Sequence, residues 1–426
     1  MTTMISILGA GLSGLSAAYH LKDGYMVLEK EREVGGLCRS VNMDGYVFDY
    51  APHILFTRDE YTRNLFFSLL GDNLHTHERR AYIYMMNTYV KYPFEANLSP
   101  LPRHVIDECI QGVIDRRPSE PHNFMEWIHS TFGDGIARHY MVPYNQKTWK
   151  HPLEEMNTDW IAGRVPSPGV EEMRKGAEGR QDKDFGPNAV FWYPKRGGIG
   201  ALATQLSKGL NVSLGSTATE LKPHGDGVKV VYMKDGRRRV VESDHVLSSL
   251  PLPEVVKMID DTPEEVHRAA ERLVHNSIVC VMVGVKRPRI TDKHWLYFPE
   301  EDLVFNRISF PMNFSPQTTP EGRSSILVEV TYRDRVDVEE TKIRVLEDLV
   351  KAGLIDADDE VETCTAADFK YAYVIYDLDH RKNVNIIHRY LKGNRITPIG
   401  RFGEWEYYNM DKAIQSGRRA AEALGR

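Results

Sequence analysis

The chain has few cysteines, no long hydrophobic run and no excess of positive charge. Its 426 residues include four cysteines that lie far apart and match no metal-ligand spacing, and we interpret them as reduced thiols. The net charge of -6 argues against nucleic acid as a partner. No apolar run reaches the roughly 18 residues that a membrane span needs, so we expect no membrane segment. The cysteines are Cys38, Cys109, Cys280 and Cys364.

The N-terminal stretch MISILGAGLSG lacks the basic start and the long apolar core of a signal peptide. We therefore expect a cytoplasmic protein. Hydrophobic residues make up 42% of the chain, which is enough for a buried core, and the length suggests two or three domains or one large core with insertions. The sequence leaves a homo-oligomer open.

The segment MISILGAGLSGLSAAYHL reads as a short apolar strand, a glycine turn and an amphipathic helix. Gly9, Gly11 and Gly14 fit the spacing G-x-G-x-x-G, which serves a tight turn, the close approach of a pyrophosphate and close helix packing. The N-terminus of the helix offers free N–H groups to phosphates. Glu29 follows a second strand at the position where a carboxylate can bind a ribose hydroxyl. Together these features predict a dinucleotide-binding fold.

A second glycine pair, Gly35 and Gly36, follows Glu29 in EKEREVGGLCRS. Such a pair lets the backbone pass close to a cofactor. The arrangement resembles the FAD-binding glutathione-reductase type 2 superfamily, which includes amine oxidases, protoporphyrinogen oxidases and sugar mutases. The arrangement favours FAD over NAD. Cys38 lies inside the motif, and we interpret it as a small side chain packed in the core. The expected cofactor contacts here are Gly9, Gly11, Leu12, Ser13, Gly14, Glu29, Lys30, Gly35, Gly36 and Leu37.

Patterns along the rest of the chain predict a discontinuous α/β fold. Helical periodicity marks residues 102–178, and PSEPHNFMEWI carries a helix start. The polar stretch GAEGRQDKDFGPN is expected to form a mobile loop. We expect a Rossmann-like FAD-binding domain of residues 1–80, 190–265 and 395–426, a helical domain of residues 100–188, and an antiparallel-sheet substrate domain of residues 81–99 and 266–394.

Several segments, in order along the chain from Met4 to Ala420, are similar to the eukaryotic type of UDP-galactopyranose mutase. They are KYPFEANLSPLP, MVPYNQKTW, GRVPSPG, GPNAVFWYPKRGGIGAL, HWLYFPEEDLVFNRISF, SILVEVT and IGRFGEWEYYNMD, while YAPHILFT is closer to the bacterial branch. The resemblance implies a flavin-dependent mutase that interconverts pyranose and furanose forms of a nucleotide-diphospho-sugar, UDP-galactose or a relative. It implies a covalent adduct between flavin N5 and the sugar, FAD that is active when reduced, and NADPH or NADH as the reductant.

The resemblance also assigns roles to single residues, block by block. It implies a catalytic set of His53 beside the flavin and Arg164, Arg307 and Arg401 around the sugar diphosphate, where arginine forks suit phosphate oxygens. The implied substrate contacts are Tyr373 and Tyr407 at the phosphates, Asn188 at the sugar, Tyr144, Asn145 and Trp149 on the nucleoside side, Tyr92 and Phe94 in the uracil pocket, and Trp295 and Tyr297 at further substrate-side positions.

The C-terminal segment is expected to be ordered. Asn409 and Met410 open a closing helix whose N–H groups can meet the flavin, and Ser416, Gly417 and nearby alanines let that helix pack closely against the sheet. Each assignment has a structural alternative, because a single arginine is usually a surface ion-pair residue, a lone histidine is more often structural, and Trp405 suits core packing. Three arginines inside matching blocks favour the functional interpretation.

Four departures from the family pattern leave the sugar and the base open. Ala51 or Pro52 replaces a flavin-loop glycine and would stiffen that loop. Phe56 replaces a second histidine, and Phe314 replaces a phosphate-binding tyrosine. Glu95 replaces a glutamine beside the base pocket; a carboxylate offers only acceptors, so it suits a base with N–H donors, or it faces solvent.

Two other functions stay open at this stage. An FAD-dependent oxidoreductase of the amine oxidase or protoporphyrinogen oxidase type would share the cofactor fold, which is an argument by analogy. A non-catalytic protein that binds a nucleotide sugar or a flavin would share the binding residues but show no turnover.

Overall fold

A five-stranded parallel sheet is gathered from three distant parts of the chain. In the computed structural model, which describes residues 4–117, 119–161, 164–181, 183, 185–186 and 188–425, its strand order is β19-β13-β1-β2-β9. All four residues of β1 are buried, as expected for a central strand covered on both faces. The strands are β1 (Ile5–Leu8), β2 (Tyr25–Leu28), β9 (Val212–Ser213), β13 (His245–Ser248) and β19 (Ile396–Pro398).

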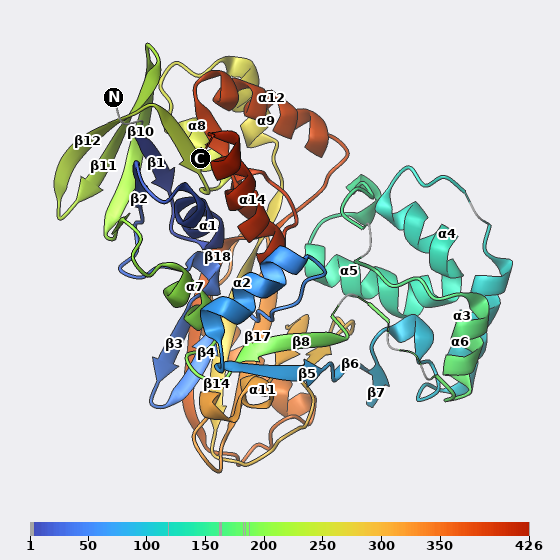
Figure 1. The fold of residues 1–426 in the computed structure, drawn as a ribbon. Helices are drawn as coiled ribbons and strands as arrows, with labels where there is room; N and C mark the ends of the chain where they lie inside the picture. Colours follow the sequence, from blue (N-terminus) through green and yellow to red (C-terminus); the bar gives the residue numbers. More distant parts are fainter. Residues whose placement is uncertain are drawn as a thin grey trace.

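The N-terminal and C-terminal helices pack against each other beside this sheet (Figure 1). They are α1 (Leu12–Leu21) and α14 (Met410–Ala423). A Cβ atom on Gly417 would lie 2.1 Å from the carbonyl oxygen of Ser13, so the two backbones touch at this glycine. The expectation that Gly417 packs on the sheet is therefore wrong; its close contact is with α1. The other helices of this part are α2 (Glu60–Leu70), α7 (Gly200–Leu206), α8 (Leu252–Lys257), α9 (Glu264–Glu271), α12 (His380–Gly393) and α13 (Gly400–Gly403).

A second, mostly antiparallel sheet has seven strands in the order β18-β14-β17-β16-β15-β6-β7. Its interior strand β14 buries both faces: Val279, Val281 and Val283 join a core that includes α11, and the alternate residues Cys280 and Met282 join a core with the hairpin β3–β4. The strands are β6 (Ala81–Met85), β7 (Thr88–Lys91), β14 (His275–Val285), β15 (Trp295–Tyr297), β16 (Arg307–Ser309), β17 (Ser324–Tyr332) and β18 (Val361–Val374), with helices α10 (Pro311–Phe314) and α11 (Val338–Lys351).

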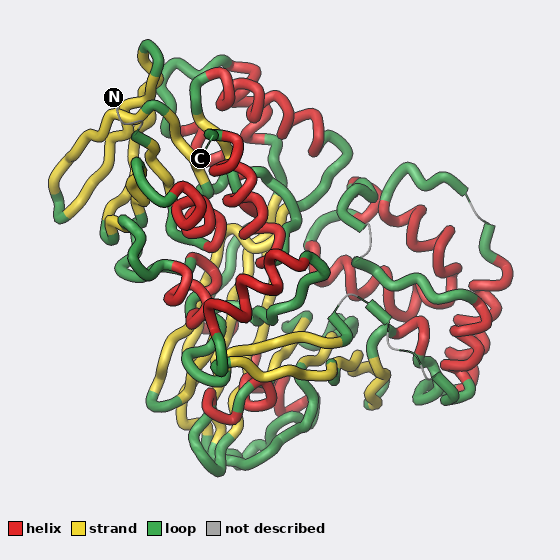
Figure 2. The backbone as a smooth tube through the Cα atoms, viewed as in Figure 1, coloured by secondary structure: helices red, strands yellow, loops and turns green. Residues whose placement is uncertain are grey.

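A group of helices forms a separate lobe, seen on the right of Figures 1 and 2. The predicted helix start is present, because the side chain of Asn123 accepts a hydrogen bond from the backbone N–H of Glu126 at 2.9 Å. Three positions of the predicted mobile loop, 182, 184 and 187, lie outside the described residues. The helices are α3 (Arg103–Asp115), α4 (Phe124–Ile136), a π-helical turn (Ala137–Met141), α5 (Val142–Trp149) and α6 (Val170–Ala177).

Small sheets complete the fold, and the predicted α/β class with one parallel and one antiparallel sheet is confirmed. Across the described ranges, the structure has no helix that is both long and apolar enough to span a membrane. The remaining strands are β3 (Ser40–Met43), β4 (Tyr46–Asp49), β5 (Leu74–Glu78), β8 (Val190–Pro194), β10 (Ser216–His224), β11 (Gly227–Lys234) and β12 (Arg237–Ser243), and short 3-10 turns cover Gly36–Cys38, Phe94–Ala96, Leu153–Glu155 and Pro316–Thr318.

The contact at Gly417 leads to a test of the fold. Gly417→Ala should lower the free energy of unfolding by about 2 kcal/mol or more, because the added methyl group would overlap the backbone of α1. The measurement is thermal unfolding of the purified protein. Gly393→Ala is the matched control, since a Cβ there meets no described atom within 4 Å; an equal loss in both variants would contradict the packing argument.

Candidate cofactor and substrate site

The first candidate site is the turn between β1 and α1, at the carboxyl edge of the parallel sheet. Gly9 has a φ angle of 92°, and a Cβ on Gly14 would lie 2.0 Å from the Gly9 carbonyl oxygen, so both positions require glycine. A Cβ on Gly11 would meet no atom of the described residues within 4 Å, which leaves open space beside the loop. Helix α1 begins there without a side-chain cap, so the N–H groups of Leu12 and Ser13 remain available to a phosphate.

Glu29 lies beside the same turn and is largely buried. Its Oε2 accepts a hydrogen bond from Ala10 N at 2.7 Å and its Oε1 one from Glu31 N at 2.9 Å. Each carboxylate oxygen keeps a second lone pair, which a ribose hydroxyl can use.

The second glycine pair lies against this turn. Gly35 donates from its backbone N–H to the carbonyl oxygen of Ala10 at 2.8 Å, and a Cβ on Gly36 would lie 3.3 Å from the Cα of Gly11. Leu37 is half-buried in the 3-10 turn that follows, whereas the side chain of Lys30 is exposed. The structure therefore brings the predicted cofactor residues of the N-terminal motif together, with Lys30 as the member whose side chain lies in solvent.

A second uncapped helix start lies at α14. Asn409 is the N-terminal flanking residue but its side chain makes no capping hydrogen bond, and Met410 behind it is buried. Gly400, before Arg401, donates its N–H to the Ser416 hydroxyl at 2.7 Å, and this bond ties the arginine segment to α14. These features fit FAD. The glycine turn, with open space at Gly11, and the two uncapped helix starts suit its pyrophosphate, and the lone pairs of Glu29 suit its ribose.

The second candidate site is a cluster of arginines and tyrosines around Tyr407. Arg401 donates to the carbonyl oxygens of Tyr408 at 2.7 Å and Ala372 at 3.0 Å, and its guanidinium carbon lies 4.7 Å from the centroid of the Tyr407 ring. Burial lowers the pKa of Arg401, yet a guanidinium stays charged in proteins. No acidic side chain in the described part of the chain pairs with it, so its charge lacks a counter-ion.

Arg164 lies over the same tyrosine ring, with its guanidinium carbon 5.1 Å from the centroid. It donates to the carbonyl oxygens of Trp160 and Tyr407, both at 2.6 Å, and its Nε is buried without a partner. Among the described residues it too has no acidic partner, and its charge is one of the causes that lower the pKa of Arg401. Two nearby cations without a carboxylate favour an anionic ligand.

Arg307 differs, because its charge is already paired. Its Nε and Nη2 donate to the two oxygens of Glu329, Nη2 to Oε1 at 2.8 Å, and Glu329 is only 1% exposed. Nη2 also lies 3.5 Å from the hydroxyl of Tyr373. The Tyr373 ring in turn lies 5.8 Å from the ring of Tyr407 and 5.4 Å from the guanidinium carbon of Arg401, so the three predicted arginines and both predicted phosphate tyrosines form one cluster.

His53 belongs to the same region. Burial lowers its pKa to about 4, and the nearby charges of Arg401 and Arg307 contribute to the shift. The imidazole is therefore neutral at pH 7. Its Nδ1 lies 2.8 Å from the carbonyl oxygen of Ala51, which can only accept, so Nδ1 carries the proton and Nε2 is free to accept a hydrogen bond.

The predicted aromatic residues differ in how they join the cluster. Trp149 contacts Tyr373 and Tyr407, with ring centroids 5.7 and 5.8 Å apart, and Tyr297 contacts both Tyr92 and Tyr144. Phe94 stacks on Tyr140, which stacks on Tyr144. Asn145 is used inside α5, where it accepts from Trp149 Nε1 at 3.0 Å and donates to Met141.

Trp295 lies between the cluster and a second core. It is on β15 with Tyr297, the side chains of the two residues interact, and Tyr92 and Tyr297 both pack against the core that contains Trp295. The ring of Trp295 contacts Phe191, His294 and Phe314 in that core. Phe314, at the position of the missing tyrosine, is buried in that core, and Trp405 is fully buried as expected.

Sequence reasoning missed Arg79, which is only 7% exposed. It donates to the side-chain oxygen of Asn188 at 2.7 Å and to the carbonyl oxygen of Phe185 at 2.6 Å, and its guanidinium carbon lies 4.8 Å from the centroid of the Tyr92 ring. Arg79 thus holds Asn188 beside Tyr92. In the sequence, Arg79 lies in the charged stretch HERRAY, which is typical of an exposed segment.

Glu95 is buried, so the interpretation that it faces solvent is wrong. Burial raises the pKa of its carboxyl to about 7, and no other side chain in the described ranges makes a hydrogen bond to it.

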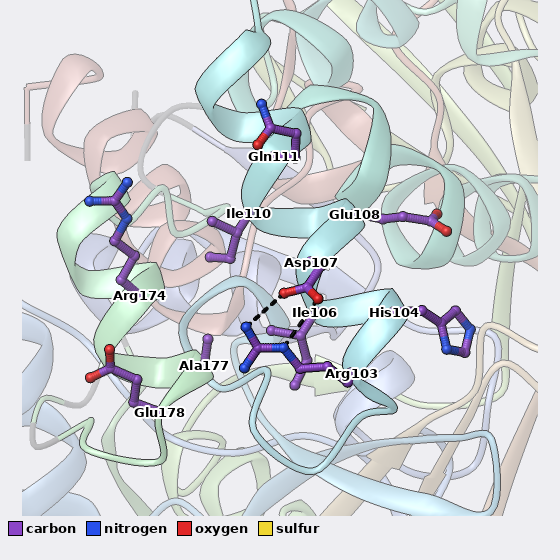
Figure 3. A pocket seen from close by; sticks show the side chains of 10 residues that line it. All are labelled: Arg103, His104, Ile106, Asp107, Glu108, Ile110, Gln111, Arg174, Ala177 and Glu178. Carbon is purple, nitrogen blue, oxygen red and sulfur yellow. Dashed lines mark hydrogen bonds and ion pairs between the residues drawn. The ribbon is translucent and has the colours of Figure 1, made fainter.

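A hollow of about 770 Å³ lies between α3 and α6 (Figure 3). Arg103 and Asp107 in its wall form an ion pair with an N–O distance of 3.0 Å, and Arg174 and Glu178 line the opposite side. None of the predicted site residues lines it, and its charges compensate one another, so it is a surface feature and not the candidate site.

Residues 12–425 match the sequence model of the family described as flavin containing amine oxidoreductase. A solved structure of reduced UDP-galactopyranose mutase superposes with a TM-score of 0.94 at 26% identity, covering 100% of this chain and 94% of that one, and so confirms the resemblance. Putrescine oxidase bound to putrescine, at 19% identity and a TM-score of 0.65 with full coverage of both chains, shares the fold. A 4,4'-diapophytoene desaturase from Staphylococcus aureus is 27% identical over 158 residues, which span 36% of this chain and only 30% of the desaturase.

The arginines provide a stability test. Arg307→Met should lower the free energy of unfolding by about 3 kcal/mol, because it leaves the buried Glu329 carboxylate without its partner. Arg401→Met removes a cation that has no acidic partner, so its loss should be clearly smaller. Urea unfolding of the two variants in phosphate-free buffer checks the order; equal losses would show that the two charges are compensated alike.

Glu95 predicts a pH dependence. Its folded pKa of about 7 lies above the ordinary value of 4.5, so the folded chain keeps a proton that the unfolded chain releases, and this stability is lost as the pH rises from 4.5 through 7. The groups that face it are Tyr92, Tyr140 and Cys109. Glu95→Gln should therefore gain stability at pH 8, on the order of 2 kcal/mol, and none at pH 4.5. A pH-independent difference in thermal midpoint would contradict this.

Proposed function

The chain belongs to the flavin-containing amine oxidoreductase family, and on that premise we propose that it is a flavin-dependent mutase acting on a nucleotide-diphospho-sugar. The proposed reaction interconverts the pyranose and furanose forms of the sugar and makes the protein an isomerase. The observation that carries the proposal is the pair of cations, Arg164 and Arg401, that share one tyrosine ring and have no acidic partner among the described residues.

The charge of a diphosphate suits this cluster. Arginine forks donate to phosphate oxygens in pairs, and the hydroxyls of Tyr373 and Tyr407 add neutral donors beside them. Arg307 contributes less net charge, because Glu329 already accepts from it. A protonated amine or an apolar substrate would leave the charges of Arg164 and Arg401 without compensation.

The remaining residues divide the other tasks of such a site. We propose that the parallel-sheet part holds FAD and that the seven-stranded sheet and the helical lobe hold the sugar nucleotide. When bound and reduced, FAD supplies the nucleophile that no protein residue of the cluster offers. The neutral His53 would offer Nε2 as a hydrogen-bond acceptor to the flavin, and Arg79 would keep Asn188 in place for the sugar. NADPH or NADH as the reductant and a cytoplasmic location rest on the sequence alone.

An FAD-dependent oxidoreductase is the second candidate. The family match and the shared fold with putrescine oxidase favour it. It ranks below the mutase because an amine substrate would be repelled by the uncompensated arginines.

The test is an assay of the fully reduced holoprotein with UDP-galactopyranose and other nucleotide sugars, with furanose product separated by chromatography. Arg401→Met and Tyr407→Phe should each lower kcat/KM, the arginine variant on the order of 10- to 100-fold because a charge-assisted hydrogen bond is lost. The exposed Arg389→Met is the control and should keep full activity.

Three outcomes separate the candidates. Furanose product supports the mutase. Oxygen consumption with an amine, in the absence of any added reductant, would replace it with the oxidoreductase. Nucleotide-sugar binding without product from any sugar would leave only a non-catalytic binding protein.

A further inference from the structure

The arginine cluster is one end of a longer row of aromatic rings, of which Phe94 and Tyr140 are buried. Tyr297 is paired across the strands with Arg307 and contacts the rings of Tyr92 and Tyr144, with centroids 5.5 and 5.4 Å apart. Tyr144 stacks on Tyr140 at 5.5 Å, and Tyr140 stacks on Phe94 at 4.8 Å. These ring contacts run without interruption from the cations to the 3-10 turn that carries Glu95.

Glu95 is the acidic end of this row of rings. It directly follows Phe94, it is 2% exposed, and its charge is one of the causes that raise the pKa values of the Tyr92 and Tyr140 hydroxyls, after burial and neighbouring tyrosines. No cation in the described residues pairs with it; Arg79, the charge over Tyr92, donates instead to Asn188 and Phe185. The Glu95 carboxyl has its own backbone N–H as a donor. A buried carboxyl with so few donors carries a desolvation penalty that a ligand with N–H groups can offset.

We propose that Glu95 selects a nucleoside diphosphate whose base carries an amino group, such as cytosine or guanine, over one with uracil or thymine. The inference deepens the proposed function and rests on it for the position of the diphosphate. Flat aromatic rings suit a planar base, the cations suit its phosphates, and the two carboxyl oxygens of Glu95 suit adjacent N–H groups.

The donor pattern of the bases decides the direction of the preference. Guanine presents a ring N–H beside an amino group, and cytosine presents an amino group, so both can donate to a carboxylate. Uracil and thymine present one ring N–H between two carbonyl oxygens. The partial negative charges of these oxygens would repel the carboxylate of Glu95. Ionisation of Glu95, with its pKa near 7, makes this preference strongest at pH 8.

The experiment is calorimetric titration of the FAD-bound protein with CDP, GDP, UDP and dTDP at pH 8. CDP or GDP should bind roughly tenfold more tightly than UDP and dTDP, the factor that one good base contact supplies. Glu95→Gln should weaken CDP and GDP and strengthen UDP, because an amide offers one donor and one acceptor. Glu120→Gln, an exposed change of the same chemistry, should alter none of the four affinities.

Each contrary result has a separate meaning. Equal or tighter binding of UDP by the unmodified protein overturns the base preference and leaves the mutase proposal standing. An equal change of all four affinities in Glu95→Gln shows that Glu95 acts on the fold and overturns its role in selection. Absence of binding by every nucleoside diphosphate overturns this inference and the proposed diphosphate site together.

Discussion

The backbone contact between α1 and α14 is the constraint on which both candidate sites depend. Gly417 lets α14 approach Ser13 of α1, and the Ser416 hydroxyl accepts from Gly400 next to Arg401. One contact therefore holds α14 against the helix that follows the candidate phosphate turn and, through Ser416, fixes the segment that carries Arg401 and Tyr407. The cofactor turn and the arginine cluster cannot shift independently, because a few residues of α14 and α13 belong to both.

The arginines show how burial and pairing divide similar side chains into different roles. Arg307 is held by Glu329, and this pair gives the cluster a rigid edge with little net charge. Arg164 and Arg401 are held only by carbonyl oxygens, which fix their orientation and leave their charge uncompensated. A row of aromatic rings thus has two cations at one end and the carboxyl of Glu95 at the other. This distribution of charge matches an elongated ligand with an anionic group at one end and hydrogen-bond donors at the other.

Much of the cofactor region could be predicted from the sequence, because it is encoded locally: the glycine turn, Glu29 and Gly35 lie within about thirty residues and obey a known spacing. The arginine cluster could be predicted only through resemblance, since Arg164, Arg307 and Arg401 are far apart in the chain. The partners that set their properties could not be predicted: neither Glu329 nor Arg79 carries a local signal, and their hydrogen bonds are formed only by the folded chain. The burial of Glu95 likewise comes from the packing of α6 against its short 3-10 turn and from Cys109 of α3, which faces it, and no local pattern in the sequence predicts this.

The dispersed origin of the parallel sheet has a consequence for biosynthesis. Strand β1 and helix α1 are made long before β19, which completes that sheet, and α14, which packs on α1. Until then the glycine-bearing and alanine-bearing face of α1 is exposed, and such surfaces recruit chaperones or aggregate in nascent chains. The protein's yield in a cell therefore depends on how long the unfinished chain stays protected.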